Sequence, residues 1–140
     1  GVKQKGLELE LDGRWPNGVR TRLSYALQES KDVDTGKFLL NSPKHLVKLN
    51  SVVPLWSDKL FLGLEEQFTA RRKTLTGSAS KYFITNLTLF SQNLFEGLEA
   101  SASVYNVFNQ KYQDPSSGEH LQDRLKQDGT TFRFKLTFRF

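Results

Sequence analysis

Few side chains in this sequence could perform metal or acid–base chemistry. The only histidines are His45 and His120, which lie far apart along the chain, and cysteine is absent. Metal sites take their ligands from His, Cys and carboxylates at short, regular spacings, and no such spacing occurs here. The sequence also lacks a Gly-rich phosphate loop, a nucleophile elbow and a paired-carboxylate motif. We therefore expect a protein that is not an enzyme and that binds neither a metal nor a cofactor.

The most regular arrangement of charged side chains occurs in the C-terminal stretch 132–140. Its odd positions are polar, namely Arg133, Lys135, Thr137 and Arg139. Its even positions are all apolar, namely Phe132, Phe134, Leu136, Phe138 and Phe140. Because successive side chains of a strand point to opposite faces, this pattern predicts one strand with an apolar face and a largely cationic face.

Alternation alone leaves two interpretations of this strand open. In a soluble sandwich or barrel, the apolar face would point inward to a core. In a transmembrane barrel, the same face would point outward to lipid and the polar face would line the lumen. A strand of about nine residues is long enough to cross the hydrocarbon at a tilt.

Composition indicates one folded β-domain. The chain has 140 residues, of which 37% are hydrophobic and 12% aromatic, and this aromatic content disfavours disorder. No apolar run approaches the roughly 18 residues of a membrane-spanning helix, which does not exclude spanning by strands. The net charge of +5 is spread along the chain, so we expect no nucleic-acid partner.

Alternating apolar and polar residues predict an all-β fold, an antiparallel meander of about seven strands. The strands span residues 6–12, 19–28, 45–53, 60–71, 82–91, 98–109 and 132–140. The faces of 82–91 stay open, because two sets of apolar residues compete there. The first two strands form a hairpin around the turn 15–18, in which Pro fixes φ and Asn-Gly tolerates positive φ.

Charges on this hairpin and two residues further along lead to specific expectations. An acidic face meets a basic face, which predicts cross-strand pairs near Asp12–Arg20 and Glu10–Arg22, each worth about 1 kcal/mol or less. Pro54 is expected to end the third strand. Glu66 lies in the apolar phase of the fourth strand, which suggests a bulge or a position near the loop end.

The connections between predicted strands alternate between short and long, and the short ones carry Trp15, Trp56 and Phe95. Tight turns at one end, long polar loops at the other and aromatics near the rims are typical of outer-membrane barrels. This asymmetry favours the transmembrane interpretation. Because such barrels have even strand numbers, seven strands indicate the C-terminal portion of a larger barrel. The start at Gly1, without Met or a signal peptide, fits a piece of a longer protein.

A segment near the end of the sixth predicted strand resembles a known family. Its matching residues are Asn106, Phe108, Asn109, Tyr112, Asp114 and Pro115. They are similar to an Asn-x-Phe-Asn-x-x-Tyr-x-Asp-Pro segment on the penultimate strand of TonB-dependent outer-membrane receptors. Those receptors also end on an aromatic strand with a terminal Phe. The segment 41–45 resembles the approach to an earlier strand, so the resemblance covers nearly the whole chain.

The resemblance implies that residues 1–140 form the last strands of a barrel of roughly 22 strands in the bacterial outer membrane. It implies TonB-energised uptake of an iron–siderophore complex, cobalamin or a similar solute. The plug domain and the N-terminal region that contacts the TonB complex are absent from these residues. The apolar residues of 132–140 resemble the signal read by the barrel-assembly machinery, and they would also face outer-membrane lipid.

In such a barrel, the expected lumen-lining side chains are Glu65, Glu99, Arg133, Lys135 and Arg139. The alternative is a self-contained soluble or small β-barrel that binds an apolar ligand in its interior. The two differ in the direction of the apolar faces. A lipid-facing fragment with two open edges should self-associate in buffer or depend on detergent.

Overall fold

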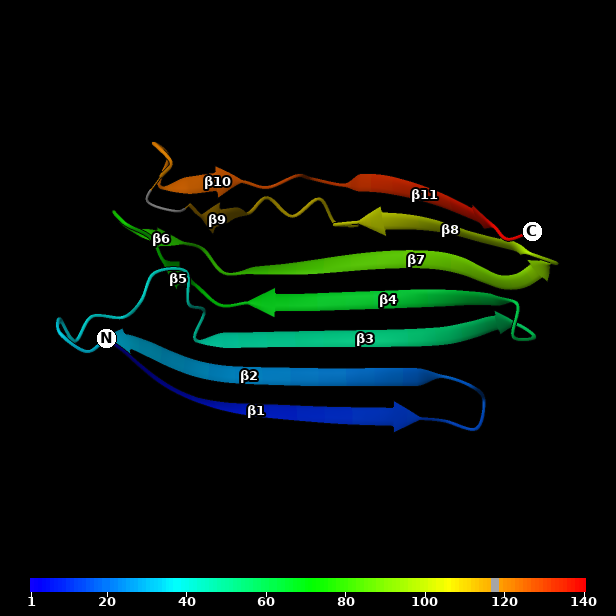
Figure 1. Ribbon diagram of the computed structural model, residues 1–140, viewed down its shortest axis with the longest axis horizontal. Coiled ribbons are helices and arrows are strands. Elements are labelled where there is room, and N and C mark those ends of the chain that lie inside the picture. Colours follow the sequence, from blue (N-terminus) through cyan, green and yellow to red (C-terminus); the bar gives the residue numbers. More distant parts are fainter. Residues whose placement is uncertain (117–118) are drawn as a thin grey trace.

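The computed structural model describes residues 1–116 and 119–140 and shows one antiparallel sheet of seven strands (Figure 1). Each strand is hydrogen-bonded to the next in the order β1-β2-β3-β4-β7-β8-β11. The strand bounds are β1 (Val2–Arg14), β2 (Arg20–Asp32), β3 (His45–Trp56), β4 (Leu60–Thr69), β7 (Tyr82–Phe95), β8 (Leu98–Tyr105) and β11 (Thr131–Phe138). No helix in the described ranges is long and apolar enough to cross a membrane. The expected seven-stranded meander is confirmed.

Two small hairpins occupy the longer connections. They pair β5 (Arg72–Lys73) with β6 (Ser78–Ala79) and β9 (Gln113–Pro115) with β10 (Arg124–Lys126). Figure 1 places both hairpins and the loop after β2 at one end of the sheet, and the tight turns at the other end. The edge strands β1 and β11 run in the same direction, because six antiparallel pairings separate them.

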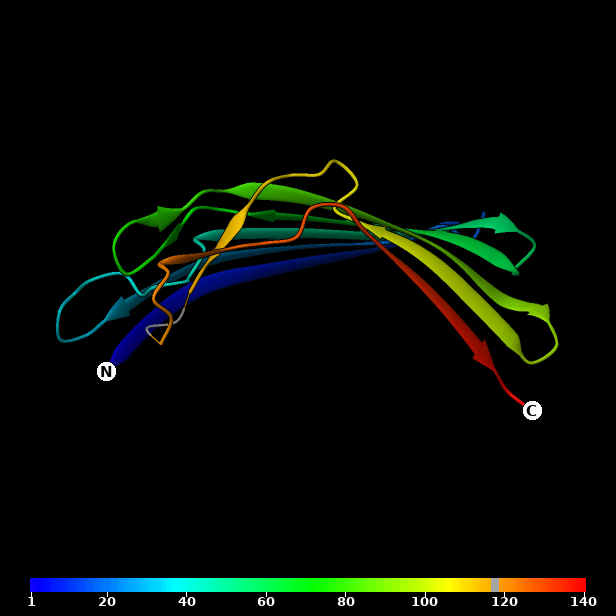
Figure 2. The same ribbon diagram turned by 90° about the horizontal axis from the view of Figure 1, so that it is seen from above.

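The sheet is a single twisted layer rather than half of a sandwich (Figure 2). Among the residues that the structure describes, the only buried hydrophobic one is Ala79, which lies in a loop hairpin. A soluble domain of this length would bury a substantial apolar core between two layers or inside a closed barrel. The strands form neither arrangement, so the structure does not support the alternative in which the apolar faces point inward.

Pro54 does not end β3, and that prediction is wrong. The strand continues to Trp56, Pro54 pairs with Phe61 of β4, and the register shifts between Pro54 and Trp56. Proline has no backbone N–H and is tolerated where a bulge interrupts the ladder. The distortion is therefore local, and β3 reaches the tight turn.

Glu66 causes no bulge. β4 pairs regularly with both neighbours here, and Glu66 faces Leu49 of β3 and Thr85 of β7. The bulge prediction is wrong because a charged side chain does not disturb a backbone ladder. The other expectation agrees with the structure, since Glu66 lies near the loop end of β4.

The first hairpin has a register that differs from the expected one. Its turn is closed by a hydrogen bond from Trp15 N to Val19 O of 3.0 Å, which aligns Asp12 with Arg22. The Nε atom of Arg22 lies 2.9 Å from Asp12 Oδ1 and 3.5 Å from Glu10 Oε1. The Glu10–Arg22 pair is therefore confirmed, and the Asp12–Arg20 pair is replaced by a second contact of Arg22.

Candidate functional site

The apolar side chains of the strands gather on one face of the sheet, which we call the outer face. Directly paired residues share a face, and the ladders align Leu9 with Tyr25 and Leu62 with Leu89. The register also settles the face of β7 that the sequence left open. Its outward residues include Phe83, Leu87 and Leu89.

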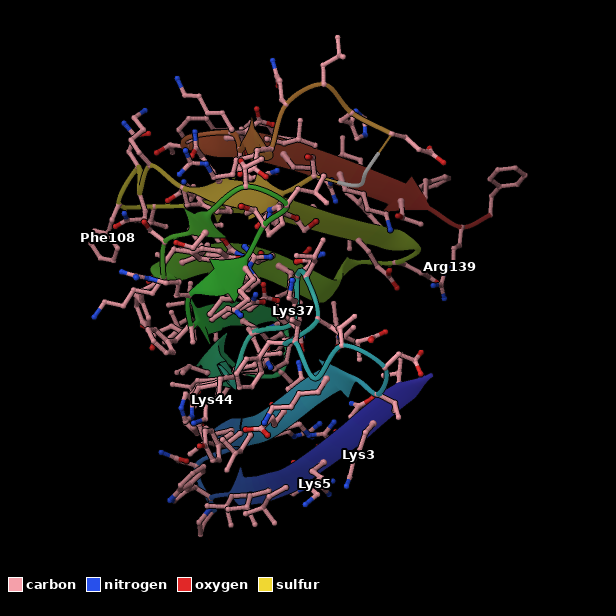
Figure 3. The ribbon with its side chains drawn as sticks, turned by 90° about the vertical axis from the view of Figure 1, so that its left-hand side faces the viewer. Lys3, Lys5, Lys37, Lys44, Phe108 and Arg139 are labelled. Atoms are coloured by element: carbon pink, nitrogen blue, oxygen red, sulfur yellow. The ribbon has the colours of Figure 1, made fainter. Side chains whose placement is uncertain are left out.

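The outer face lies on the convex side of the sheet. Figure 3 looks along the strands, which are bowed into an arc, and shows Lys3 and Lys5 on its outer side. Leu7 and Leu9 have the same parity on β1 and therefore share that side. Arg139 points to the inner side of the arc. The sheet thus has the geometry of a curved wall with an apolar exterior and a polar interior.

The expected apolar residues of the C-terminal strand lie on this outer face. They pair across to β8 as Phe132 with Val104, Phe134 with Ala102, Leu136 with Ala100 and Phe138 with Leu98. Phe134 and Leu136 are 79% and 76% exposed. Phe140 follows the end of β11 and is exposed as well. Apolar surface of this extent is costly in water, so this face requires a covering medium.

Aromatic side chains mark the tight-turn end of the wall. Trp15, Trp56 and Phe95 flank the three tight turns and are each at least half exposed. Tryptophan combines a large apolar ring with one N–H donor, which suits the boundary between lipid and water. This position matches the aromatic girdle at one rim of a membrane barrel.

The five expected lumen-lining residues lie on the inner face or point to it. Glu65 Oε1 accepts a hydrogen bond from Asn86 Nδ2 at 2.8 Å, and Arg139 Nη2 lies 3.4 Å from Glu99 Oε1. The guanidinium of Arg133 lies 5.3 Å from the centre of the Tyr105 ring. Lys135 pairs across with Ser101 on the same face. Exposed pairs of this kind contribute little to stability and leave their polar atoms available to another molecule.

A hollow with a mixed lining lies on the inner face near the tight turns. It measures about 460 Å³, and its apolar residues Val52, Pro54, Phe61 and Phe90 lie beside the polar side chains of Arg20, Asp58 and Gln92. The Phe61 and Phe90 rings are stacked with centres 5.2 Å apart. Sequence reasoning missed this feature, because Phe61 occupies the polar phase of its strand and the faces of 82–91, which contain Phe90, stayed open.

Asn106 organises the break between the sheet and the long loop that follows β8. It is buried and left-handed, with φ of 50°, a conformation that Asn tolerates better than most residues. Its backbone N–H donates to Asn86 Oδ1 at 2.9 Å, and its Oδ1 accepts from the Gln110 N–H at 2.8 Å. Its Nδ2 donates to the carbonyl oxygens of Gln110 and Asp128. The Asn106 side chain thus links both ends of the loop, and the Asn106 backbone N–H connects this point to β7.

The remaining residues of the sequence motif occupy the start of that loop. Phe108 is 75% exposed and projects from the convex side of the sheet (Figure 3). Asn109 is left-handed with φ of 51°. The Tyr112 ring packs on Tyr82 with centres 4.3 Å apart, and Pro115 is buried in β9. The motif therefore shapes a turn and anchors a loop, and its residues form no catalytic arrangement.

Arg72 connects three long loops at the loop end of the sheet. It is buried, its Nη2 bonds Asp114 Oδ1, and its Nη1 donates to Asn41 Oδ1 at 3.1 Å. Its guanidinium also lies 5.4 Å from the centre of the Tyr82 ring. No local pattern in the sequence points to Arg72, because its partners lie about 30 and 40 residues away along the chain.

The pKa values of two further loop residues, Asp123 and Tyr112, are shifted by the packing of these loops. The pKa of Asp123 is lowered because the Thr74 hydroxyl donates to its carboxylate at 2.6 Å and the Thr76 N–H donates at 3.0 Å. Burial raises the pKa of the Tyr112 phenol. The Asp123 contacts join the hairpin of β5 and β6 to the loop that contains β10.

We expect Arg72→Ala to loosen these loops without unfolding the sheet. Loss of the guanidinium removes the ion pair with Asp114 and the hydrogen bond to Asn41, which costs about 2 kcal/mol locally because the Asp114 side chain is 34% exposed to water. Limited proteolysis should then cut within 72–81 and 110–128 at least several times faster. Arg71→Ala, which changes the exposed neighbour, should leave the cleavage rate unchanged. Equal rates for Arg72→Ala and the parent chain would contradict this role.

The two histidines do not form a metal site. His45 Nδ1 lies 2.9 Å from the Tyr25 hydroxyl oxygen on β2, whereas His120 is exposed in the last long loop. Within the described ranges, no group of three His, Asp or Glu side chains is placed to hold a metal ion.

No protein-family model matches the chain. One curated relative is the ferric-pyoverdine BN7/BN8 receptor of Pseudomonas putida. It is 28% identical over 134 residues, which are 93% of this chain and 16% of the relative. The chain therefore spans a small part of that protein, and the similarity extends over nearly all of its own length.

Solved structures share the fold of the whole described sheet. The ferripyoverdine receptor of the outer membrane of Pseudomonas aeruginosa matches 98% of this chain with a TM-score of 0.76 and 21% identity. BauA, the ferric preacinetobactin receptor of Acinetobacter baumannii, matches 98% with a TM-score of 0.81 and 15% identity. Fiu, the ferric-catecholate import receptor of E. coli K12, matches 99% with a TM-score of 0.78 and 19% identity. The matched portions are 19%, 22% and 21% of those chains.

Proposed function

We propose that this chain, a barrel segment of the TonB-dependent receptor family in the outer membrane, forms part of the wall of a receptor that imports a ferric siderophore. The observation that carries the proposal is the curved single-layer sheet, with its large apolar side chains uncovered on the convex face. A wall of this kind can separate lipid from a polar lumen. The protein is accordingly a transporter component rather than an enzyme.

The two ends of the sheet suggest an orientation. We propose that the tight turns, with Trp15 and Trp56, face the periplasm and that the long loops face the cell exterior, as in bacterial outer-membrane barrels. β1 and β11 are parallel, so they cannot join in an antiparallel seam. Further strands must close the barrel, and we place this chain at its C-terminal end.

The substrate class follows from the relatives and stays a proposal. The relatives described above are receptors for ferric pyoverdine, ferric preacinetobactin and ferric catecholates. The chain spans 16% of the curated relative and about a fifth of each solved receptor. A ferric siderophore is therefore favoured over cobalamin. The plug, the TonB contact and most substrate contacts would come from other parts of the receptor. The apolar face of β11 would serve recognition by the barrel-assembly machinery.

The behaviour of the isolated chain in solution tests the lipid-facing assignment. We expect association in buffer, detected by light scattering, because one face is apolar and both edge strands are open. Detergent should disperse the protein and give a β-type circular dichroism spectrum. A monodisperse β-rich monomer in plain buffer would contradict the assignment and favour an apolar interior.

A further inference from the structure

A cluster of lysines occupies the outer face of the first hairpin, immediately beyond its apolar residues. The ladder continues on this face from Leu7 opposite Leu27 to Lys5 opposite Glu29, and then to Lys3 opposite Lys31. Like charges placed directly opposite each other destabilise a β-ladder. Lys31 is compensated by Glu29, whose Oε1 lies 2.8 Å from Lys31 Nζ, whereas no acid among the described residues forms an ion pair with Lys3 or Lys5. The positive charge of Lys3 and Lys5 therefore lacks a partner within this face.

Lys73, from the loop hairpin that contains β5, adds a further positive charge beside Lys31 of β2. Lys31 Nζ lies 2.8 Å from Glu29 Oε1 and 4.6 Å from the centre of the Phe38 ring, and Lys73 Nζ lies 4.9 Å from the same ring. Among the described residues, Glu29 is the only acid paired with any of these lysines. We call Lys3, Lys5, Lys31 and Lys73 the basic rim cluster. It carries an excess of positive charge.

The position of the basic rim cluster relative to the apolar face defines what could bind it. A strand rises about 3.3 Å per residue, so Lys5 and Lys3 lie about 7 Å and 13 Å beyond Leu7 toward the loop end of the sheet. Both point to the convex side (Figure 3). A shallow hollow of about 130 Å³ lies between them, lined by Lys3, Lys5, Glu29 and Lys31. In a membrane wall this level corresponds to the headgroups, directly above the hydrocarbon.

We propose that the basic rim cluster binds the phosphate group of a lipid in the leaflet next to the long loops, and this inference rests on the proposed function. The lysine ammonium groups donate charge-assisted hydrogen bonds to the phosphate oxygens, which gives Lys3 and Lys5 an anionic partner. The acyl chains of the same lipid cover the leucine side chains below. The free ammonium groups and the apolar surface then serve one molecule.

The test uses the full-length receptor that carries this chain, inserted into phosphatidylcholine vesicles with or without phosphatidic acid, a lipid phosphomonoester. Lipid retained by the receptor after detergent extraction is measured by mass spectrometry. The double variant Lys3→Gln/Lys5→Gln should retain phosphatidic acid about twenty-five-fold less than the parent, because each lysine near the surface contributes about fivefold. Lys135→Gln, on the inner face of β11, should retain it fully.

Two controls separate the possible outcomes. Circular dichroism checks that the double variant keeps its β-spectrum, which we expect because both lysines are exposed. Inorganic phosphate is added as competitor, and displacement of the lipid at equal concentration would indicate a free-phosphate site and overturn the lipid assignment. Equal retention by parent and double variant would also overturn it.

The same experiment distinguishes failure of this inference from failure of the proposed function. Insertion into pure phosphatidylcholine vesicles depends on the apolar face alone. A receptor that inserts there but shows no preference for phosphatidic acid refutes the lipid site and leaves the proposed function standing. A receptor that inserts into neither vesicle refutes both.

Discussion

Leu136→Arg is expected to destabilise the membrane-inserted barrel by about 1–3 kcal/mol, because the cost of a lipid-facing arginine is largest at the bilayer midplane and falls toward the interfaces. Leu136 lies two residues before the end of β11 at Phe138, pairs with Ala100 on the outer face and is largely exposed. Among the described residues, the paired strand β8 offers no anionic partner on this face, since it presents only alanines and other apolar residues there. The arginine would therefore remain unpaired in hydrocarbon.

The adjacent residue supplies a matched control. Thr137 lies on the inner face and pairs across with Glu99, so Thr137→Arg introduces the same side chain beside a carboxylate and water. We expect a change in stability within about 0.5 kcal/mol for this variant. The two substitutions differ by one position along the strand and by the face on which the guanidinium emerges.

Urea titration of the full receptor in lipid vesicles measures the difference, with the folded fraction followed by its shifted electrophoretic mobility. The midpoint should fall for Leu136→Arg and stay in place for Thr137→Arg. Similar losses for both variants would mean that strand integrity rather than lipid contact controls the result. Full tolerance of Leu136→Arg would show that the convex face does not meet hydrocarbon.

The strands and their faces could be predicted from the sequence, because a period of two is a local property. Leu7, Leu9 and Leu11 on β1 and the even residues of β11 lie on one face as their alternation requires. Turn residues set the connections, as for Asn17-Gly18, where Gly18 has φ of 83°. Where two apolar sets overlap, as on β7, only the pairing with β4 decides the face.

Features that depend on partners distant in sequence could not be predicted. The register of the first hairpin depends on one backbone hydrogen bond at Trp15, which shifts every cross-strand pair. Arg72 meets Asn41 and Asp114 only because the sheet brings their loops together. The inner hollow beside Phe61 arises from stacking across strands, for which alternation carries no information. The motif around Asn106 was visible in the sequence, but its partners were not.

Asn106→Ala is expected to lower the stability of the folded receptor by about 3 kcal/mol. The substitution removes the side-chain acceptor of the Gln110 N–H and the donor to two carbonyl oxygens, all in a part-buried setting. Each of these three hydrogen bonds contributes about 0.5–1 kcal/mol, because Gln110 and Asp128 are exposed and water replaces part of the lost bonding. Alanine must also adopt the left-handed conformation, which adds about 1 kcal/mol.

Two further variants separate these contributions. Asn106→Gly loses the same hydrogen bonds but accepts the positive φ, so it should be about 1 kcal/mol more stable than Asn106→Ala. Asn109→Ala places alanine in a left-handed position that is exposed, with one contact to Lys111, and should cost about 1 kcal/mol. Urea midpoints in detergent give the ranking. If Asn106→Ala and Asn109→Ala prove equally stable, backbone strain explains both, and the hydrogen bonds of Asn106 do not hold the loop.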